Sequence, residues 1–203
     1  MPELALILWA VFGLVGFAGR AALQRAQTGS WGVLGVSGAP LSAEWTAGVL
    51  FVGSLALAVA GPALEAADAI GPIDALDEDG LRGLGIALFV AGLVTTFGAQ
   101  LAMGSSWRIG VSETEQTDLV TGGPFAIVRN PIYSAMLPAV AGLVLVAPSW
   151  PALAGWLLLL LALELQVRVV EEPYLLRAHG EAYASYAARV GRFIPAVGRL
   201  RPR

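Results

Sequence analysis

The sequence predicts an all-α integral membrane protein with about five transmembrane helices. Of its 203 residues, 57% are hydrophobic and only 13% are charged, whereas soluble domains carry about 25% charged residues. Five apolar runs approach the length of about 20 residues that a helix needs to cross a bilayer core. Backbone polar groups in lipid need partners within their own segment, so these runs should be helices. The runs are Leu4–Gly19, Trp45–Leu64, Leu84–Met103, Ile132–Val146 and Ala152–Val170.

The first three runs predict scaffold spans. The N-terminal residues before the first run lack the basic stretch of a signal peptide, so we expect that run to be a retained span. The second and third runs contain recurring small residues, among them Gly48, Gly53 and Gly92, that allow close helix packing in lipid. Residues 26–43, between the first two runs, are rich in Gly and Ser, and the sequence leaves open whether they lie in the interface or dip into the membrane.

The last two runs predict a helical hairpin followed by a cytoplasmic helical tail. The fourth run is short, and the segment Ala147–Pro151 holds two prolines that should end one helix and start the next. Whether this hairpin crosses the membrane fully stays open. The chain is expected to form a single membrane domain over residues 1–203, with residues 1–99 as scaffold and residues 100–195 as the catalytic region.

The arginines predict how the chain is oriented. All 12 basic residues are arginine, and all but Arg82 fall after the first run, between the third and fourth, or at and beyond the end of the fifth. By the positive-inside rule, the N-terminus then faces out and the C-terminus faces the cytoplasm of a multi-pass cell (inner) membrane protein.

The composition also excludes several classes of function. The chain has no cysteine, one histidine (His179) and a net charge of −3. The absence of thiolates and of a histidine cluster argues against a metal site, and the acidic balance argues against nucleic acid as a partner.

A Gly-Pro turn followed by an Arg-Asn-Pro bend is the first stretch that could carry chemistry. In the segment Thr121–Tyr133, Gly-Gly-Pro predicts a rigid turn, and Pro131 occupies the first helical position that proline favours. Arg129 precedes that helix start, a place that attracts anions such as carboxylates. An ordinary loop with an arginine that reaches the interface is an equally simple interpretation.

The second stretch is a set of ionisable residues at the end of the fifth run: Glu164, Arg168, Glu171 and Glu172. Their spacings predict one shared helical face. A Glu164–Arg168 pair would explain two of them. The other two carboxylates end a helix, where the dipole disfavours negative charge, so a cation should offset them: Arg168, Arg177, a tail arginine or a ligand ammonium.

Two further features complete the candidate region. His179-Gly180 predicts a helix stop followed by a short helix with Tyr183 and Tyr186, and His179 itself is expected to be a cap or surface residue. The segment Gln100–Arg108 could line a substrate entrance. The simpler interpretation, which we prefer, is a helix end with an interfacial tryptophan anchor.

Together these stretches resemble the isoprenylcysteine carboxyl methyltransferase family of integral membrane enzymes, which is related to the phospholipid N-methyltransferases. The resemblance covers roughly residues 100–195. It departs from the family pattern at Asn130, where histidine is common, and at His179, where phenylalanine is usual. The matching residues are Gly123, Pro124, Phe125, Val128, Arg129, Pro131, Tyr133, Glu171, Glu172, Gly180, Tyr183, Tyr186, Arg189, Val190, Arg192, Ile194 and Pro195.

The resemblance implies methyl transfer from S-adenosylmethionine to a lipophilic carboxylate, thiol or lipid amine. Glu171 or Glu172 could bind the cofactor's ammonium, and the Arg129–Tyr133 bend could bind its carboxylate. Aromatic rings suit the sulfonium, so Tyr133, Tyr183 or Phe125 should lie near it. Arg168 and Arg192 are candidates for orienting a carboxylate substrate, with Glu172 as a third catalytic candidate. The expected cofactor-binding residues are Gly123, Pro124, Phe125, Val128, Arg129, Asn130, Tyr133, Glu171, Glu172 and Tyr183.

Two other functions stay open as alternatives. Membrane reductases of the sterol-reductase type share a similar Arg-His/Asn-Pro-x-Tyr pattern and use NADPH, but a dinucleotide phosphate needs clustered cationic donors, and the Glu-Glu pair suits S-adenosylmethionine better. A non-enzymatic scaffold or small transporter ranks third, since transporters usually show repeated halves or polar groups near mid-membrane. In each case the lipid bilayer and a lipophilic small molecule or lipid are the expected partners.

Overall fold

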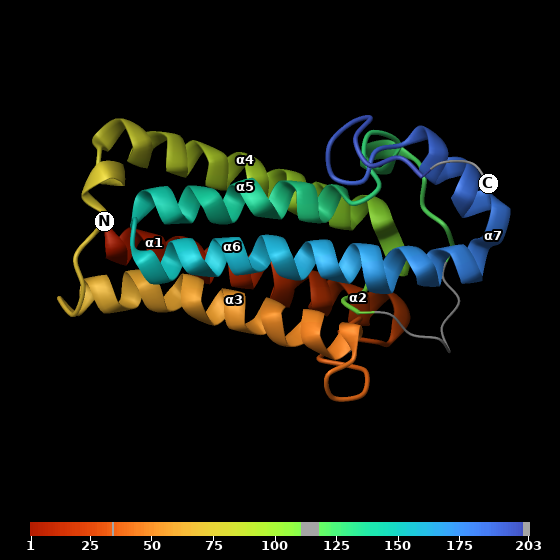
Figure 1. The fold of residues 1–203 in the computed structure, drawn as a ribbon, viewed down its shortest axis with the longest axis horizontal. Helices are drawn as coiled ribbons and strands as arrows, with labels where there is room; N and C mark the ends of the chain where they lie inside the picture. Colours follow the sequence, from red (N-terminus) through yellow and green to blue (C-terminus); the bar gives the residue numbers. More distant parts are fainter. Residues whose placement is uncertain (34, 111–117, 201–203) are drawn as a thin grey trace.

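The computed structural model describes residues 1–33, 35–110 and 118–200, and its named elements are all helices. They form an elongated bundle with the N-terminus at one end and the C-terminus at the other (Figure 1). Within these described ranges, four helical segments are long and apolar enough to cross a membrane: Pro2–Thr28, Ala43–Ala66, Asp79–Ser106 and Trp150–Arg189. The helix α5 (Pro131–Val146) is apolar but shorter. The expectation of an all-helical membrane fold is confirmed.

The first segment continues past the point where the sequence predicted its end. It consists of α1 (Pro2–Phe12), the π-helical turn η1 (Gly13–Gly19) and α2 (Arg20–Thr28), and it stops at Gly29, whose φ is +79°. Arg20 does not end the helix because its guanidinium is buried against other parts of the chain, where Nη2 donates to the carbonyl of Gly104 at 2.5 Å. A buried arginine with an internal partner need not mark a membrane boundary.

The second and third segments are α3 and α4. The helix α3 (Ala43–Ala66) begins at Ser42, whose hydroxyl accepts a hydrogen bond from the Trp45 amide as an N-cap. A 3₁₀ turn, η2 (Asp74–Leu76), precedes α4 (Asp79–Met103), and a second 3₁₀ turn, η3 (Gly104–Ser106), follows it.

The C-terminal half contains η4 (Gly123–Ala126), α5, α6 (Trp150–Leu165), the π-helical segment η5 (Gln166–Glu171) and α7 (Glu172–Arg189). Pro131 occupies the first turn of α5, as predicted. The helix α7 is broken at Gly180, whose φ of 52° and ψ of −126° are not helical. The predicted stop at Gly180 is therefore confirmed, and the helix that follows carries Tyr183 and Tyr186.

Small residues allow the closest helix crossings. The helices α4 and α5 pack along each other, as do α3 and α6. At the α4–α5 crossing, a methyl group added to Gly85 would lie 2.6 Å from the Gly142 carbonyl oxygen. At the α3–α6 crossing, one added to Gly155 would lie 2.6 Å from the backbone nitrogen of Ala58. Backbone therefore meets backbone at both crossings, as small residues permit in lipid.

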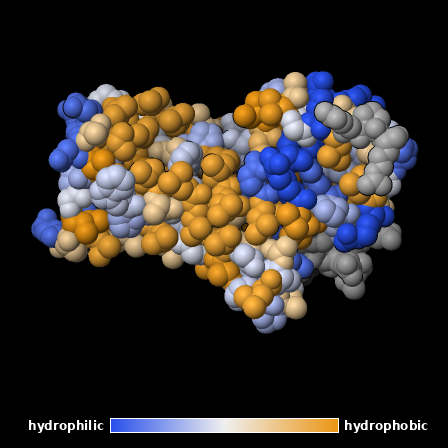
Figure 2. Space-filling view, in the orientation of Figure 1, coloured by the Kyte–Doolittle hydropathy of each residue, from blue (hydrophilic) through white to orange (hydrophobic). Residues whose placement is uncertain are grey.

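The two ends of the bundle differ. The N-terminus, the α3–α4 connection and the α5–α6 turn lie at one end, and α2, η4 and α7 lie at the other (Figure 1). The α5–α6 turn contacts the α3–α4 connection directly, since the Ile73 amide donates to the Pro148 carbonyl at 2.7 Å. Figure 2 shows hydrophobic residues along the middle of the bundle and hydrophilic residues at both ends. This distribution suits a protein whose ends face water and whose sides face lipid.

Candidate active site

The Arg-Asn-Pro bend before α5 pairs through its backbone with the tail that follows α7. Val128 and Gly191 form an isolated parallel bridge. Next to it, the Arg129 amide donates to the Gly191 carbonyl at 2.8 Å, and the Asn130 amide donates to the Arg192 carbonyl at 3.1 Å. The bend before α5 is thus tied to the segment after α7, some sixty residues later in the chain.

A buried ion cluster reinforces this pairing. Arg129 Nη2 lies 2.5 Å from Glu172 Oε1, and the Arg129 side chain is only 1% exposed. Arg192 meets the same carboxylate with two groups, Nε at 2.8 Å from Oε1 and Nη2 at 2.8 Å from Oε2. The guanidinium of Arg129 also donates to three carbonyls, those of Ala187, Val190 and Gly198.

Glu172 is therefore the carboxylate that protein cations neutralise. The sequence analysis named a tail arginine as one possible counter-charge, and Arg192 fills that position together with Arg129. Hydrogen bonding to Glu172 raises the pKa of the Arg192 guanidinium above its usual value, so this pair stays charged. Since one carboxylate is shared between two guanidiniums, the cluster holds the start of α5, the start of α7 and the tail together.

Glu171 has a different environment. Its Oε1 accepts a hydrogen bond from the Tyr133 hydroxyl at 2.8 Å and one from Gln166 Nε2 at 3.3 Å. Among the residues that the structure describes, no arginine forms an ion pair with it. Two neutral donors orient this carboxylate, which leaves its negative charge without a paired cation from the described chain.

A π-helical turn separates the roles of the charged residues around Glu171. In η5, Gln166 and Glu171 are five residues apart and still contact each other, as π-helical geometry allows. The prediction that Glu164, Arg168, Glu171 and Glu172 share one face is wrong, because it assumed regular α-helical spacing. Glu164 and Arg168 pair with each other, and the Arg168 side chain is 57% exposed.

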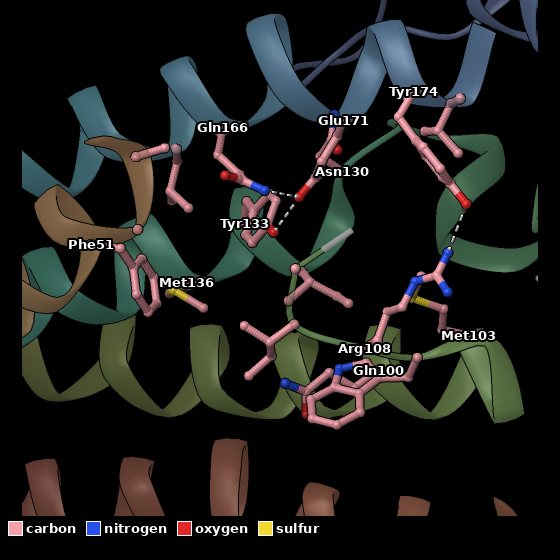
Figure 3. A pocket seen from close by; sticks show the side chains of 18 of the residues that line it. Phe51, Gln100, Met103, Arg108, Asn130, Tyr133, Met136, Gln166, Glu171 and Tyr174 are labelled. Carbon is pink, nitrogen blue, oxygen red and sulfur yellow. Dashed lines mark hydrogen bonds between the residues drawn. The ribbon is translucent and has the colours of Figure 1, made fainter. Parts of the chain in front are cut away.

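A cavity of about 420 Å³ lies between the helices next to Glu171. Its walls come from η1, residues 33 and 35–37, α3, the end of α4, residues 107–110 and 118–120, η4, the bend before α5, α5, α6, η5 and α7. Figure 3 shows Glu171, Tyr133 and Gln166 joined by hydrogen bonds in one wall, with Arg108 and Tyr174 nearby. Phe51 and Met136 lie at the other end. The cavity is thus polar at one end and apolar at the other.

Gln100 and Trp107 close the cavity on the α4 side. Both residues line it, and Trp107 is only 2% exposed. The preferred interpretation of Trp107 as an interfacial anchor is wrong, since its ring is buried and the Arg20 guanidinium stacks over it with a centroid distance of 4.6 Å. The alternative, that Gln100–Arg108 borders a site, fits where Gln100, Met103, Trp107 and Arg108 lie.

Three hydrogen bonds between the first segment and the end of α4 hold this wall in place. Gln24 Nε2 donates to the Ser105 carbonyl at 2.7 Å, one helical turn beyond the Arg20–Gly104 bond. One turn earlier, Gln100 Nε2 donates to the carbonyl of Gly16, within the π-helical turn η1, at 2.8 Å. These three bonds attach the first segment to the end of α4.

The expected cofactor and catalytic residues divide into two groups. Six of them line the cavity: Phe125, Arg129, Asn130, Tyr133, Glu171 and Tyr183. Six others do not line it: Gly123, Pro124, Val128, Glu172, Arg168 and Arg192. In the second group, Glu172 and Arg192 belong to the ion cluster, Val128 belongs to the backbone pairing, and Arg168 faces outward with Glu164.

Backbone donors of the bend before α5 form hydrogen bonds within the protein, although the sequence predicted that they would bind a ligand. The amides of Arg129 and Asn130, which were expected to approach a ligand carboxylate, donate to tail carbonyls. Within the described part of the chain, the Arg129 Nε is buried and has no hydrogen-bond partner.

The sequence analysis missed Gln166 and Tyr174. Gln166 is the one amide side chain in the Ala152–Val170 run, and a polar side chain within a membrane span could have marked it as a site residue. Tyr174 lines the cavity, and its hydroxyl accepts a hydrogen bond from Arg108 Nη2 at 3.3 Å. The Arg108 guanidinium carbon lies 5.9 Å from the centroid of the Tyr174 ring. Nothing in the local pattern singled out Tyr174.

These features define a membrane-embedded helical protein with a ligand cavity at one end of its bundle. A model of the phospholipid methyltransferase family matches residues 81–182, which run from α4 to α7. The chain belongs to this phospholipid methyltransferase family. The match includes Tyr133, Glu171 and Glu172 but stops before Arg192.

A solved structure has a similar fold. It is that of a eukaryotic intramembrane Ras methyltransferase, isoprenylcysteine carboxyl methyltransferase, with a TM-score of 0.62 and 24% sequence identity. The similarity covers 99% of this chain and 70% of that one. No curated protein matches the chain. The family match and the fold therefore identify a membrane methyltransferase architecture.

Proposed function

We propose that this chain transfers a methyl group from S-adenosylmethionine to a lipophilic acceptor at the cytoplasmic face of a membrane. The acceptor's reactive group is a carboxylate, a thiol or a lipid amine. The family membership and the fold support methyl transfer at a membrane. The structure of the cavity supports the choice of cofactor.

The environment of Glu171 is the observation that carries the proposal. A buried carboxylate normally has a cationic partner, because desolvation of an unpaired charge is costly. Glu172 has two such partners, whereas Glu171 in the cavity wall forms hydrogen bonds only with the neutral Tyr133 and Gln166 among the described residues. The Arg108 guanidinium attracts Glu171 from beyond ion-pairing distance. A ligand ammonium would supply the missing cation.

The other cavity residues also suit S-adenosylmethionine. Its carboxylate would meet Arg129, whose Nε has no hydrogen-bond partner among the described residues, or Arg108 in the same cavity. Its sulfonium would lie near the aromatic rings of Tyr133, Tyr183 and Phe125, which attract cations through their faces. The cofactor supplies an electrophilic methyl group, and the protein's task is to align the acceptor with it and to exclude water.

The ion cluster would act indirectly. Glu172, Arg129 and Arg192 hold the bend before α5 against α7, and so they position Tyr133 opposite Glu171. Glu172 and Arg192 are then positioning residues. Arg168, which pairs with Glu164 on an exposed face, has no role in our account.

We also propose a topology of five spans, with the N-terminus outside and the C-terminus in the cytoplasm. The Ile73–Pro148 hydrogen bond supports α5 as a full crossing, because it brings the α5–α6 turn to the connection at the far end of the bundle. The arginine distribution supports the orientation.

The chain has no cysteine, so the topology can be tested with single cysteines introduced at Asp77 and at Arg199 and a membrane-impermeant thiol reagent. Labelling of Asp77→Cys only from outside, and of Arg199→Cys only after permeabilisation, is expected. The reverse pattern would contradict the topology.

Methyl transfer itself is tested with cofactor carrying a tritium-labelled methyl group. The purified protein is incubated with this cofactor and with lipid and small-molecule extracts, and the labelled products are separated. At a cofactor concentration below saturation, we expect label in an organic-soluble product with the wild type and roughly tenfold less or lower with the Glu171→Gln variant. Glu164→Gln serves as the matched control and should retain transfer. Wild-type protein that binds the cofactor but labels nothing in any extract would contradict the proposal.

A further inference from the structure

The apolar end of the cavity has a defined floor. Met136 on α5 and Leu163 on α6 line the cavity, and both also belong to the main hydrophobic core of the bundle. One helical turn deeper, Val140 and Leu159 are almost completely buried in that core and do not reach the cavity. On α5 and α6 the cavity lining therefore ends at Met136 and Leu163, and on α3 it reaches Leu55, one helical turn beyond Phe51.

An aromatic stack forms the wall beside this floor. Phe51 of α3 packs edge-on against Phe17 of η1 with a centroid distance of 6.5 Å. Phe17 packs in turn against Phe12, at 5.7 Å, and Phe12 is fully buried. Because each ring is supported by the next, Phe51 cannot easily swing away from the cavity. The wall is rigid where the floor begins.

We propose that Met136 and Phe51 set the length of the hydrocarbon chain that the site accepts. This inference rests on the proposed function and deepens it, because it assigns the polar end to the cofactor and the reactive group and the apolar end to one chain of the acceptor. Figure 3 shows Phe51 and Met136 at the opposite end of the pocket from Arg108 and Tyr174. A chain that extends from the polar end toward the bundle interior would end against these two side chains.

The chemistry of the two residues predicts how each substitution acts. Met136→Ala removes most of a long, unbranched side chain and opens space toward the core, so longer chains should fit. Each further methylene that enters this space should tighten binding about fourfold, which corresponds to about 0.8 kcal/mol per buried CH₂. Met136→Phe fills the floor and should shorten the preferred chain. Phe51→Ala should widen the same end.

The test is a binding measurement that does not need the natural acceptor. Detergent-purified protein saturated with S-adenosylhomocysteine is heated with a homologous series of straight-chain carboxylic acids, and the rise in melting temperature reports binding by mass action. We expect the wild type to show an optimum chain length beyond which stabilisation falls. The optimum should move to longer chains in Met136→Ala and to shorter chains in Met136→Phe.

Leu143→Ala is the matched control. Leu143 lies on α5 in the same core cluster as Met136, but it does not line the cavity. It should therefore lower the melting temperature without moving the optimum. A wild type without any chain-length optimum, or equal shifts in Met136→Ala and Leu143→Ala, would overturn the inference. If the proposed function is wrong, the wild type will not bind S-adenosylhomocysteine in the absence of the carboxylic acids.

Discussion

Arg129 and Glu172 form a buried ion pair in which Nη2 and Oε1 are 2.5 Å apart, although the two residues are 43 positions apart in sequence. Arg192 joins them from the tail. Arg129, Glu172 and Arg192 thus pair with one another. The carboxylate that lines the cavity beside them is that of Glu171. This arrangement separates residues that build the site from residues that can bind a ligand.

Replacing Glu172 with glutamine should destabilise the fold. The substitution would leave two largely buried guanidiniums, those of Arg129 and Arg192, without their counter-charge. Breaking a buried pair by removing one partner costs about 3–5 kcal/mol. We expect a clear fall in the melting temperature of the detergent-purified protein. Glu164→Gln, which removes an exposed partner of Arg168, should change it by no more than about 2–4 °C, since exposed pairs contribute about 0–1 kcal/mol. Equal effects of the two variants would contradict the structural role of the cluster.

Replacing Tyr133 with phenylalanine should weaken cofactor binding while leaving the fold intact. The hydroxyl of Tyr133 donates to Glu171 at 2.8 Å and orients that carboxylate. A hydrogen bond to a charged group contributes about 1.5–3 kcal/mol, so we expect a loss in affinity for S-adenosylhomocysteine of roughly tenfold to a hundredfold.

A double-variant cycle tests whether Tyr133 acts through Glu171. In a Glu171→Gln background, Tyr133→Phe should have little further effect, because the carboxylate it orients is gone. Additive losses would show that the tyrosine contacts the ligand independently.

A methyl group at Gly142 should disturb the α4–α5 crossing. A Cβ at this position would clash with the Gly85 carbonyl oxygen and come within 2.8 Å of the Phe89 amide nitrogen. Overpacking of this kind costs about 1–3 kcal/mol, which should appear as a lower melting temperature for Gly142→Ala. Gly98 on α4 has nothing within 4 Å of its added Cβ, so Gly98→Ala is the matched control and should not lower it. A tolerated Gly142→Ala would show that the helices are farther apart.

The helical fold could be predicted from sequence because it depends on composition and on run length. The apolar runs became helices, Pro131 started α5, and Gly180 broke α7. The first segment was predicted too short, since Arg20 was read as a boundary. Its burial under Trp107, with a hydrogen bond to Gly104, depends on tertiary contacts to the end of α4 that local patterns do not report.

The site was predicted in part, and the π-helical turn η5 accounts for one error in it. Regular spacing placed Glu164, Arg168 and Glu171 on one face, but η5 aligns Gln166 with Glu171 and leaves Glu164 and Arg168 outside. No propensity in the sequence marks such a turn. The sequence also left open which of Glu171 and Glu172 pairs with arginines of the protein. The answer depends on Arg129 and Arg192, which approach Glu172 from distant segments.

The most direct test of the central claim is a calorimetric titration of the purified wild-type protein and its Glu171→Gln variant with S-adenosylhomocysteine. Our account predicts saturable binding at one site by the wild type and an affinity lower by roughly tenfold or more in Glu171→Gln, since a charged hydrogen bond contributes about 1.5–3 kcal/mol. Glu164→Gln should bind as the wild type does. Absence of wild-type binding, or equal affinity in wild type and Glu171→Gln, would contradict the claim that the buried Glu171 carboxylate receives the cofactor's ammonium.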